Sequence, residues 1–346
     1  MIDKNEFVSV ITCESNDITP VFFFDTTLGM EIAGLGTSSV YVPFDGEKSG
    51  RSIMALQRYL EHDAVIGAVT IFDQRTFGGR LIFPDNGTPI IIENAFRTPD
   101  RLYDHDPQET DNETLSEIIR SFKYIRKQNK DLAVGCPASS PFSIAALLRG
   151  YEALLMDMLL EPDYFDDLME FTASIQMIHA EKIMSVFDPD FAIISCAYDS
   201  IDTVGGEVFE GQIMSSLKPF FRKISAEDIP LVFHPHGTYT DSQNLGTLDK
   251  IIGSGIDCIY YGEGIDSSVL AKHCHNKVSV MGGIDTFTTI YLGPDDRVRA
   301  DVKKCLNTFS DEHYVISCSC CVDRGLNMHR MKVLVDTVRN HQKNII

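Results

Sequence analysis

The sequence contains no tryptophan, no long apolar stretch and few basic residues for its length. Its 346 residues include 30 Lys and Arg against 50 Asp and Glu, so the formal net charge is −20. A charge this negative repels phosphate backbones and anionic lipid head groups, which argues against nucleic acid and membrane surfaces as partners. The opening residues carry charge at Asp3, Lys4 and Glu6, where a signal peptide needs apolar side chains, and no later stretch approaches a membrane span. We therefore expect a cytoplasmic protein.

Phosphate-binding loops and disulfide frameworks are absent as well. The sequence has no GxxxxGKS or GxxxxGKT motif, and no GxGxxG motif that opens a helix after a strand. Its nine cysteines are an odd number in a chain large enough to fold without cross-links, so we expect free thiols or metal ligands. No linker, repeat or low-complexity segment divides the chain, which predicts one domain over residues 1–346.

The clearest pattern is a short apolar run, a turn and then a helical pattern, repeated along the chain. The eight apolar runs are Pro20–Asp25, Ala64–Thr70, Leu132–Gly135, Phe191–Ser195, Pro230–His234, Ile256–Tyr261, Lys277–Met281 and Tyr314–Ser317. The segments with helical spacing are Thr114–Lys127, Ile144–Leu159, Tyr164–Val186, Phe209–Ile224, Asn244–Ile252, Asp296–Phe309 and Leu326–His341. Eight strands, each followed by a crossover, predict an α/β fold with a single (β/α)8 TIM barrel.

Two details refine this prediction. Ile53–Leu60 and the extended-looking Gly79–Asn94 do not fit a plain strand–helix alternation, so we expect an elaborated N-terminal region on the barrel. Gly253 follows a helical segment directly and is expected to cap it in the left-handed conformation, and Pro162 suits the first turn of the next helix.

In such barrels, functional side chains gather where strands end. His234 and His236 are two residues apart in VFHPHG at one strand end, so their imidazoles point to the same side and can bind one metal ion. The alternative is that one of the two is simply hydrogen-bonded in the core.

Three cysteines lie within four residues at the end of the last predicted strand, in YVISCSCC. Cys318 and Cys320 are expected on one face of that strand, with Cys321 on the other. Two imidazoles and one thiolate form a three-ligand catalytic zinc site that leaves a position open for substrate, whereas a second thiolate would close it. The alternative is that these thiols are buried as small apolar side chains.

Carboxylates follow several of the same strand ends. Asp199 is expected in the site, where it can hold a ligating imidazole or accept a proton, and the alternative is a helix cap. Asp285 can orient a substrate or cap Thr286–Thr289, and Glu263 is a further carboxylate at the same end of the barrel. For Asp202, capping of the next helix is the favoured interpretation.

Other candidate ligands are set aside by position. His273, Cys274 and His275 have metal-like spacing but follow a helix and precede a strand, at the opposite end of the barrel from the chemistry. Cys136 and Cys196 end strands and can line the pocket, but burial as small apolar side chains is the favoured interpretation for both.

Long segments of the chain resemble the uroporphyrinogen decarboxylase superfamily, in particular its zinc- and corrinoid-dependent methyltransferase branch. The matching segments are, in order, TFGGRLIFPDNGTP, VGCPASSPFSIAALLRGYEALLMDMLLEPDYFDDLMEF, GGEVFEGQIMSSLKPFFRKI and MGGIDTFTTIYLGPDDRVRADVKKCL. Methyltransferases of that family present His-x-Cys-Gly at the fifth strand and one Cys at the last strand as zinc ligands. Here His234 matches, His236 replaces the first Cys, Cys320 aligns with the last ligand and Cys318 is a possible substitute.

The resemblance implies a zinc-dependent methyltransferase that moves a methyl group between a small methylated substrate, or a thiol acceptor, and the cobalt of a partner corrinoid protein. The chain lacks the Asp-x-His-x-x-Gly sequence that lends a histidine to cobalt, so the corrinoid is expected on that partner. Asp199, Asp285 and Glu263 are expected to orient the reacting atom. His236 in place of a thiolate leaves a more electrophilic zinc, which favours demethylation of a donor over methylation of a thiol.

Two other functions remain open at this point. One is a decarboxylase-type lyase, although DITPVFFFDTTLG has no arginine where that branch has an Arg-rich motif for its polycarboxylate substrate. The other is a metal- or corrinoid-binding protein without turnover, because a fold does not fix a function. The identity of the donor or acceptor, the direction of transfer and the oligomeric state are left open by the sequence.

Overall fold

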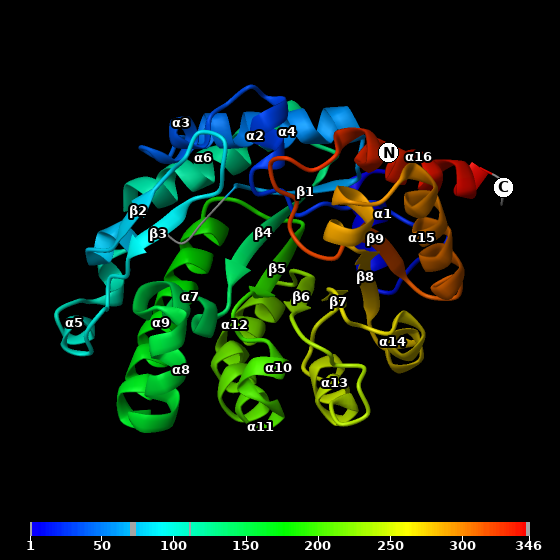
Figure 1. The fold of residues 1–346 in the computed structure, drawn as a ribbon. Coiled ribbons are helices and arrows are strands. Elements are labelled where there is room, and N and C mark those ends of the chain that lie inside the picture. Colours follow the sequence, from blue (N-terminus) through cyan, green and yellow to red (C-terminus); the bar gives the residue numbers. More distant parts are fainter. Residues whose placement is uncertain (1, 70–73, 111, 344–346) are drawn as a thin grey trace.

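The centre of the protein is a curled, all-parallel sheet of seven strands, seen in a computed structural model that describes residues 2–69, 74–110 and 112–343 (Figure 1). Its spatial order is β1-β4-β5-β6-β7-β8-β9. The strands are β1 (Ala64–Ile66), β4 (Ala133–Ser139), β5 (Phe191–Cys196), β6 (Leu231–Pro235), β7 (Cys258–Tyr261), β8 (Ser279–Ile284) and β9 (Tyr314–Cys318). All neighbouring pairs are parallel, so the carboxyl ends of the strands meet at one end of the sheet, here called the mouth. The predicted α/β class is confirmed.

Seven of the eight predicted strands are present, and the first one, Pro20–Asp25, is not a strand. This segment forms isolated bridges to β9, to β1 and to the residue Val322, without a continuous ladder. The physical reason lies in its backbone donors: Pro20 has no N–H, and the N–H of Val21 donates to the Asp63 side chain at 2.8 Å. The second predicted run is shortened to β1, and its last residue, Thr70, lies outside the described residues.

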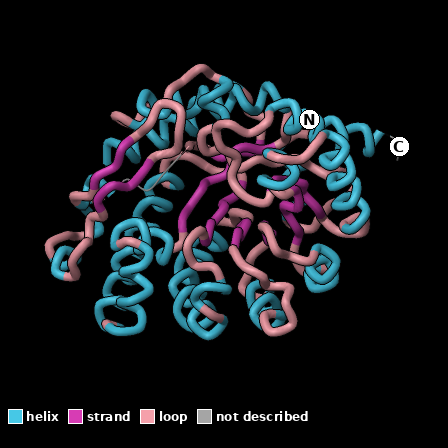
Figure 2. The backbone as a smooth tube through the Cα atoms, viewed as in Figure 1, coloured by secondary structure: helices cyan, strands magenta, loops and turns pink. Residues whose placement is uncertain are grey.

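Helices surround the sheet (Figure 2). They are α1 (Lys4–Ile11), α2 (Leu28–Ile32), α3 (Thr37–Tyr41), α4 (Gly46–Leu60), α5 (Asp100–Tyr103), α6 (Asn112–Gln128), α7 (Pro141–Arg149), α8 (Tyr151–Leu160), α9 (Pro162–Met184), α10 (Ile201–Val204), α11 (Gly206–Val208), α12 (Met214–Ala226), α13 (Leu245–Ile252), α14 (Ser267–Cys274), α15 (Asp295–Thr308) and α16 (Met328–Lys343). Short 3-10 helices span Gln74–Phe77 and Pro107–Glu109, and π-helical turns span Phe209–Ile213 and Thr286–Tyr291. Within the described residues, no helix is long and apolar enough to cross a membrane.

Two helical predictions differ from the structure, both at glycines, and one prediction at a proline agrees with it. The predicted helix Ile144–Leu159 is divided into α7 and α8 at Gly150, whose φ of +92° is outside the helical region. Gly253 caps α13 with φ −81°, so the predicted left-handed cap is wrong. Pro162 occupies the first turn of α9, as expected.

The expected N-terminal elaboration is present. Four helices, α1 to α4, come before β1, and an antiparallel hairpin of β2 (Arg80–Ile82) and β3 (Ile90–Glu93) follows it. Helix α4 is capped at its N-terminus by Asp45, whose side chain accepts the backbone N–H of Lys48 at 3.0 Å, and the helix packs against α6. The hairpin lies beside the mouth of the sheet and forms one wall of the site described next.

Candidate metal centre and its cavity

Three predicted ligands, His234, His236 and Cys320, meet at the mouth of the sheet. His234 is in β6, His236 lies just beyond the end of that strand, and Cys320 lies two residues beyond the end of β9. Their ligand atoms all lie within 4.8 Å of one another, and Cys320 Sγ is 3.8 Å from His236 Nε2. In the strand order of the sheet, β9 is three strands away from β6. The curl of the sheet nevertheless brings the ends of these two strands, and the two sequence motifs that follow them, close together.

His234 is held in an orientation that suits a metal ligand. Its Nδ1 lies 2.7 Å from the backbone carbonyl oxygen of Tyr260, which can only accept, so Nδ1 carries the proton. The imidazole also stacks on the Tyr260 ring, with centroids 4.1 Å apart. The other nitrogen, Nε2, is buried and has no hydrogen-bond partner in the described structure. A buried imidazole fixed through one nitrogen, with the lone pair of the other unsatisfied, is typical of a metal ligand.

The electrostatics of Cys320 also fit metal binding. A hydrogen bond with the Cys321 thiol is the largest cause that lowers the pKa of Cys320, and the nearby imidazoles of His234 and His236 lower it further against the effect of burial. Burial acts to lower the pKa of His236, but the contact with Cys320 and the negative charges of Glu263 and Asp199 together outweigh it, and the pKa is raised. Thiolate is the form of cysteine that binds metal. Zinc bonds to imidazole and thiolate are about 2.0–2.3 Å long, so donors this close need only a small adjustment to share one ion.

The other two cysteines of the cluster differ in position. Cys318 is fully buried, and its Sγ lies 4.0 Å from the sulfur of Met331 in α16. The expected shared face of Cys318 and Cys320 is not observed, because β9 ends at Cys318 and the chain turns before Cys320. Cys321 lies closer to the metal group, with its Sγ 3.8 Å from that of Cys320.

The predicted carboxylates are all near the mouth, and each has a hydrogen-bond partner. Asp199 is buried and accepts a hydrogen bond from the Ser143 hydroxyl at 3.0 Å, and burial raises its pKa. Asp285 accepts the backbone N–H of Thr288 at 2.6 Å, which is the helix-cap alternative. Glu263 accepts a hydrogen bond from the Ser319 hydroxyl.

Asp202 does not cap the helix that follows β5. The cap of α10 is Ser200, whose hydroxyl oxygen accepts the Asp202 N–H at 3.3 Å. The Asp202 carboxylate instead accepts from the backbone N–H of Thr238 at 3.0 Å and from its hydroxyl, which ties the loop after β6 to α10. The expectation of a cap is therefore wrong.

The residues set aside by position are outside the metal group. His273 and His275 pair with Asp249 and Glu312, and Cys274 is buried. Within the described ranges, His234, His236 and Cys320 form the one group of three or more such side chains close enough to share an ion. None of the nine cysteines, all of which lie in the described residues, forms a disulfide in the structure.

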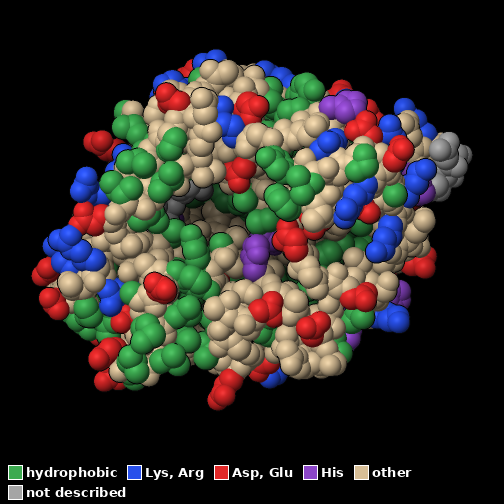
Figure 3. Space-filling view, in the orientation of Figure 1, with side chains coloured by type: hydrophobic (Ala, Val, Ile, Leu, Met, Phe, Trp, Pro, Cys, Tyr) green, Lys and Arg blue, Asp and Glu red, His purple; other side chains and the backbone are tan. Residues whose placement is uncertain are grey.

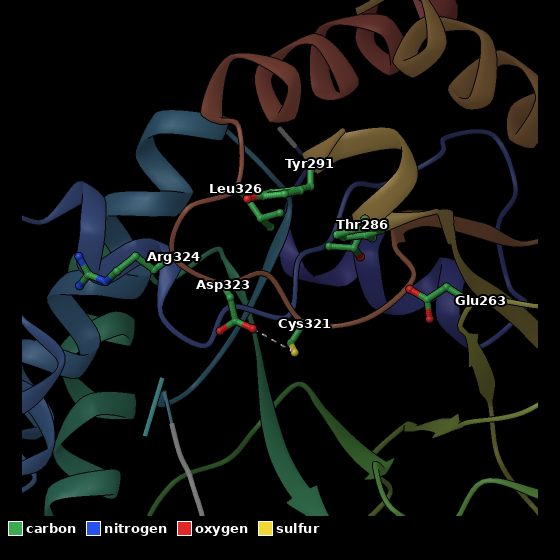
Figure 4. Close-up of a pocket in the computed structure, with 8 residues that line it drawn as sticks. Glu263, Thr286, Tyr291, Cys321, Asp323, Arg324 and Leu326 are labelled. Atoms are coloured by element: carbon green, nitrogen blue, oxygen red, sulfur yellow. Dashed lines mark hydrogen bonds between the residues drawn. The ribbon is translucent and has the colours of Figure 1, made fainter. Parts of the chain in front are cut away.

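The metal group borders a cavity of about 710 Å³, with His234 and Cys320 among its lining residues. Figure 3 shows a hollow in this face of the molecule, with hydrophobic side chains beside it. A smaller pocket of about 240 Å³ adjoins the cavity, and Cys321 and Asp323 border both. Figure 4 shows Cys321 and Asp323 pointing toward each other in that pocket, and their Sγ and Oδ2 atoms are 3.8 Å apart.

Asp323 is a site residue that the sequence interpretation missed. Its carboxylate accepts hydrogen bonds from the hydroxyls of Thr26 and Thr27, the latter at 2.9 Å. Asp323 follows the cysteine cluster by two residues, so the rule that functional side chains follow strand ends could have included it.

Asp25, the strand-end carboxylate of the first predicted run, is 2% exposed. Its Oδ1 accepts the backbone N–H of Gly29 at 3.0 Å. Burial raises the pKa of Asp25 to about 7, and the carboxylate of Asp323 adds to the rise against the effect of the Gly29 hydrogen bond.

An Asp25→Asn variant is expected to be more stable than the wild type at pH 8. The folded state holds the proton more tightly than the unfolded chain, so this group's contribution falls as the pH rises from about 4 to about 7. Asparagine is neutral at every pH, and one pKa unit corresponds to about 1.4 kcal/mol, so the gain is at most about 4 kcal/mol at pH 8 and near zero at pH 4. Urea unfolding at both pH values measures it. An equal effect of the substitution at pH 4 and pH 8 would contradict the raised pKa.

Comparisons with known proteins agree with this fold. The structure matches a methyltransferase from Methanosarcina mazei with a TM-score of 0.81 and 16% identity, covering 99% of each chain. It also matches a B12-independent methionine synthase from Shewanella sp. W3-18-1, in complex with selenomethionine, with a TM-score of 0.55, 13% identity and 95% coverage of each chain. At these identities the likeness shows the fold alone.

The sequence itself gave no match among curated proteins. A family model described as uroporphyrinogen decarboxylase (URO-D) matches residues 3–341. That match covers nearly the whole chain, in agreement with the resemblance carried by its motifs. The chain belongs to the uroporphyrinogen decarboxylase family.

Proposed function

We propose that this protein is a zinc-dependent methyltransferase of a corrinoid system, which moves a methyl group between a small methylated substrate, or a thiol, and the cobalt of a partner corrinoid protein. The observation that carries the proposal is the group of His234, His236 and Cys320 at the mouth, beside a large cavity. Membership of the family and a fold shared with a methyltransferase support it.

The side chains of the metal group have distinct parts in this proposal. His234, His236 and Cys320 would hold the zinc, which when bound supplies Lewis-acid polarisation of the heteroatom that carries or receives the methyl group. Tyr260 fixes the His234 ring through a hydrogen bond and a stacking contact, so that Nε2 faces the other two ligands without reorganisation. Cys320 supplies the one anionic ligand.

The methyl transfer is a displacement reaction in which atoms and electrons balance. In the donor direction the carbon–heteroatom bond breaks, the heteroatom keeps the bonding electron pair, and it takes a proton from solvent. Cobalt(I) of the partner supplies the electron pair of the new carbon–cobalt bond and becomes cobalt(III). We assign to Asp199, Asp285 and Glu263 the orientation of the reacting group, since in-line displacement requires both reactants close to attack geometry.

The cavity supports methyl transfer over decarboxylation of a polycarboxylate. No lysine or arginine is present among the cavity-lining residues that the structure describes. Several buried carboxylates need cationic partners, and without them the binding of a polyanion carries a large desolvation penalty.

A spectroscopic assay separates these reactions. With a corrinoid protein held as cobalt(I) and a methylated donor, the enzyme is expected to convert the cobalt(I) spectrum to that of methyl-cobalt(III). Porphyrinogen mixed with the same enzyme is expected to release no carbon dioxide. Carbon dioxide release with an unchanged cobalt spectrum would reverse the assignment in favour of the lyase, and the absence of both reactions would favour a binding protein without turnover.

A further inference from the structure

The cavity beside the metal group is much larger than a one-carbon compound requires. Its volume of about 710 Å³ falls within the range of roughly 300–1,000 Å³ that is typical of pockets for drug-sized ligands. His234 and Cys320 lie at one part of its lining, and the rest extends to the β2–β3 hairpin and to helices α6 and α9. The size and extent of the cavity therefore indicate a substrate with a body much larger than one carbon atom.

Three elements supply apolar walls. Leu81 and Ile91 are direct partners in the antiparallel β2–β3 pair, so both side chains point to the same side, and both line the cavity. Helix α9 contributes one face, since its lining residues are spaced by three or four positions. Those residues are Gln176, His179, Ala180 and Ile183, and α6 adds Thr114, Leu115 and Ile118.

Charge is scarce in this lining. Among the described lining residues, Asp323 is the one acidic side chain, and it lies near the metal group, with Cys321 between it and Cys320. Burial lowers the pKa of His179 to about 4, so that imidazole is neutral at pH 7. The polar groups of the other walls are mainly hydroxyls, which can fix the orientation of a ligand without demanding a charge on it.

We propose that the methylated substrate of this protein is a bulky, uncharged methyl ether or methyl thioether, whose apolar body occupies the cavity between the β2–β3 hairpin and α9 while its methyl-bearing atom lies at the metal group. An aliphatic methylamine is protonated at neutral pH, so its nitrogen has no free lone pair for a metal ion to polarise, which leaves oxygen or sulfur as the heteroatom. This inference rests on the proposed methyl transfer and names its substrate class.

Binding without a corrinoid tests the substrate class separately from the reaction. The zinc-loaded enzyme is titrated by calorimetry with 2-methoxynaphthalene, with 6-methoxy-2-naphthoate, which has the same body and a negative charge, and with trimethylamine. We expect 2-methoxynaphthalene to bind at least about tenfold tighter than either of the others, since an unpaired charge in an apolar site is costly. If it binds but no methyl group reaches cobalt, the proposed reaction fails and the assignment of the cavity stands.

Tryptophan substitutions test where the ligand binds. Ile91→Trp, from the hairpin, and Ala180→Trp, from α9, each fill part of the cavity and are expected to raise the Kd for 2-methoxynaphthalene about tenfold, since overpacking a fitted site is costly. Ile92→Trp is the matched control, because Ile92 is the next residue in the same strand, is 49% exposed and does not line the cavity. The wild type has no tryptophan, so each variant carries a single tryptophan whose fluorescence can be excited selectively. Ligand is expected to change the fluorescence of the first two variants and not of the third.

Three results would overturn the proposal. Tighter binding of trimethylamine or of the naphthoate would show that the cavity accepts charge. Equal Kd values for the wild type, Ile91→Trp and Ala180→Trp would place the ligand elsewhere. Displacement of 2-methoxynaphthalene by free cobalamin would assign the cavity to the corrinoid instead of to the methyl donor. Zinc content is measured in each variant, so that damage to the metal group is distinguished from a filled cavity.

Discussion

Replacing Cys320 by Ala is expected to remove zinc from the purified protein, which should otherwise carry about one ion per chain. Among the residues that the structure describes, Cys320 is the one thiol grouped within 4.8 Å of both imidazole ligand atoms, and it supplies the negative charge of the group. Loss of a direct ligand should cost more than the 10- to 100-fold in affinity that is typical of losing an outer partner. Methyl transfer should fall by at least about 10³, because polarisation by the ion is lost with it. Elemental analysis and the cobalt assay give the two readouts.

Cys318→Ala is the matched control for this variant. Cys318 is fully buried against Met331 and is outside the metal group, so the substitution removes a thiol from the same segment without touching a ligand. We expect this variant to keep its zinc. Full retention of zinc in a Cys320→Ala, His234→Ala double variant, or loss of zinc in Cys318→Ala alone, would refute the assigned ligands.

The second large effect is expected at His236, where the sequence departs from the ligand pattern of the methyltransferases that it resembles. His236→Cys should keep zinc, because thiolate is an equal or better ligand than imidazole. The position is also suitable, since Nε2 of the wild-type His236 lies 3.8 Å from Cys320 Sγ. The added negative charge makes the ion a weaker Lewis acid, so demethylation of a donor should slow by about 10²–10³. The same variant should react at least as well with a thiol acceptor. Rates with a donor and with a thiol, measured on protein of equal zinc content, give the comparison.

His236→Ala completes the test. If His236→Cys leaves demethylation unchanged, or if His236→Ala retains full zinc and activity, then His236 is a spectator and the inferred direction of transfer fails. The structure then points to Cys321 as the replacement ligand, because its Sγ lies 3.8 Å from that of Cys320. Cys318, the substitute considered from sequence, packs against α16 instead.

Local patterns were sufficient to predict the strand–helix alternation and the histidine pair. A strand has a side-chain period of two, so His234 and His236 at one strand end were expected on one side, and their ring centroids are 4.5 Å apart. The same rule gave a wrong result for Cys318 and Cys320. It holds only while the strand continues, and β9 ends at Cys318.

Competition between alternative hydrogen-bond partners also limited what could be predicted from the sequence. Ser200, not Asp202, caps α10, because the Asp202 carboxylate is taken by Thr238, which is 36 positions away in the chain. The first predicted strand was lost for the same kind of reason, since the Val21 N–H donates to Asp63. Both outcomes depend on partners that are distant in the sequence and approach only when the chain has folded.

The sequence by itself determined the α/β class, the family and the residue types of the metal group, because these are written in local periodicity and in short motifs. Only the tertiary structure decided which cysteine meets the two histidines and what lies beside them. The cavity walls come from the β2–β3 hairpin, α6 and α9, whose lining residues include Ile91, Ile118 and Ala180. No spacing in the sequence links these side chains, because their common surface exists only once the strands and helices have packed around the mouth.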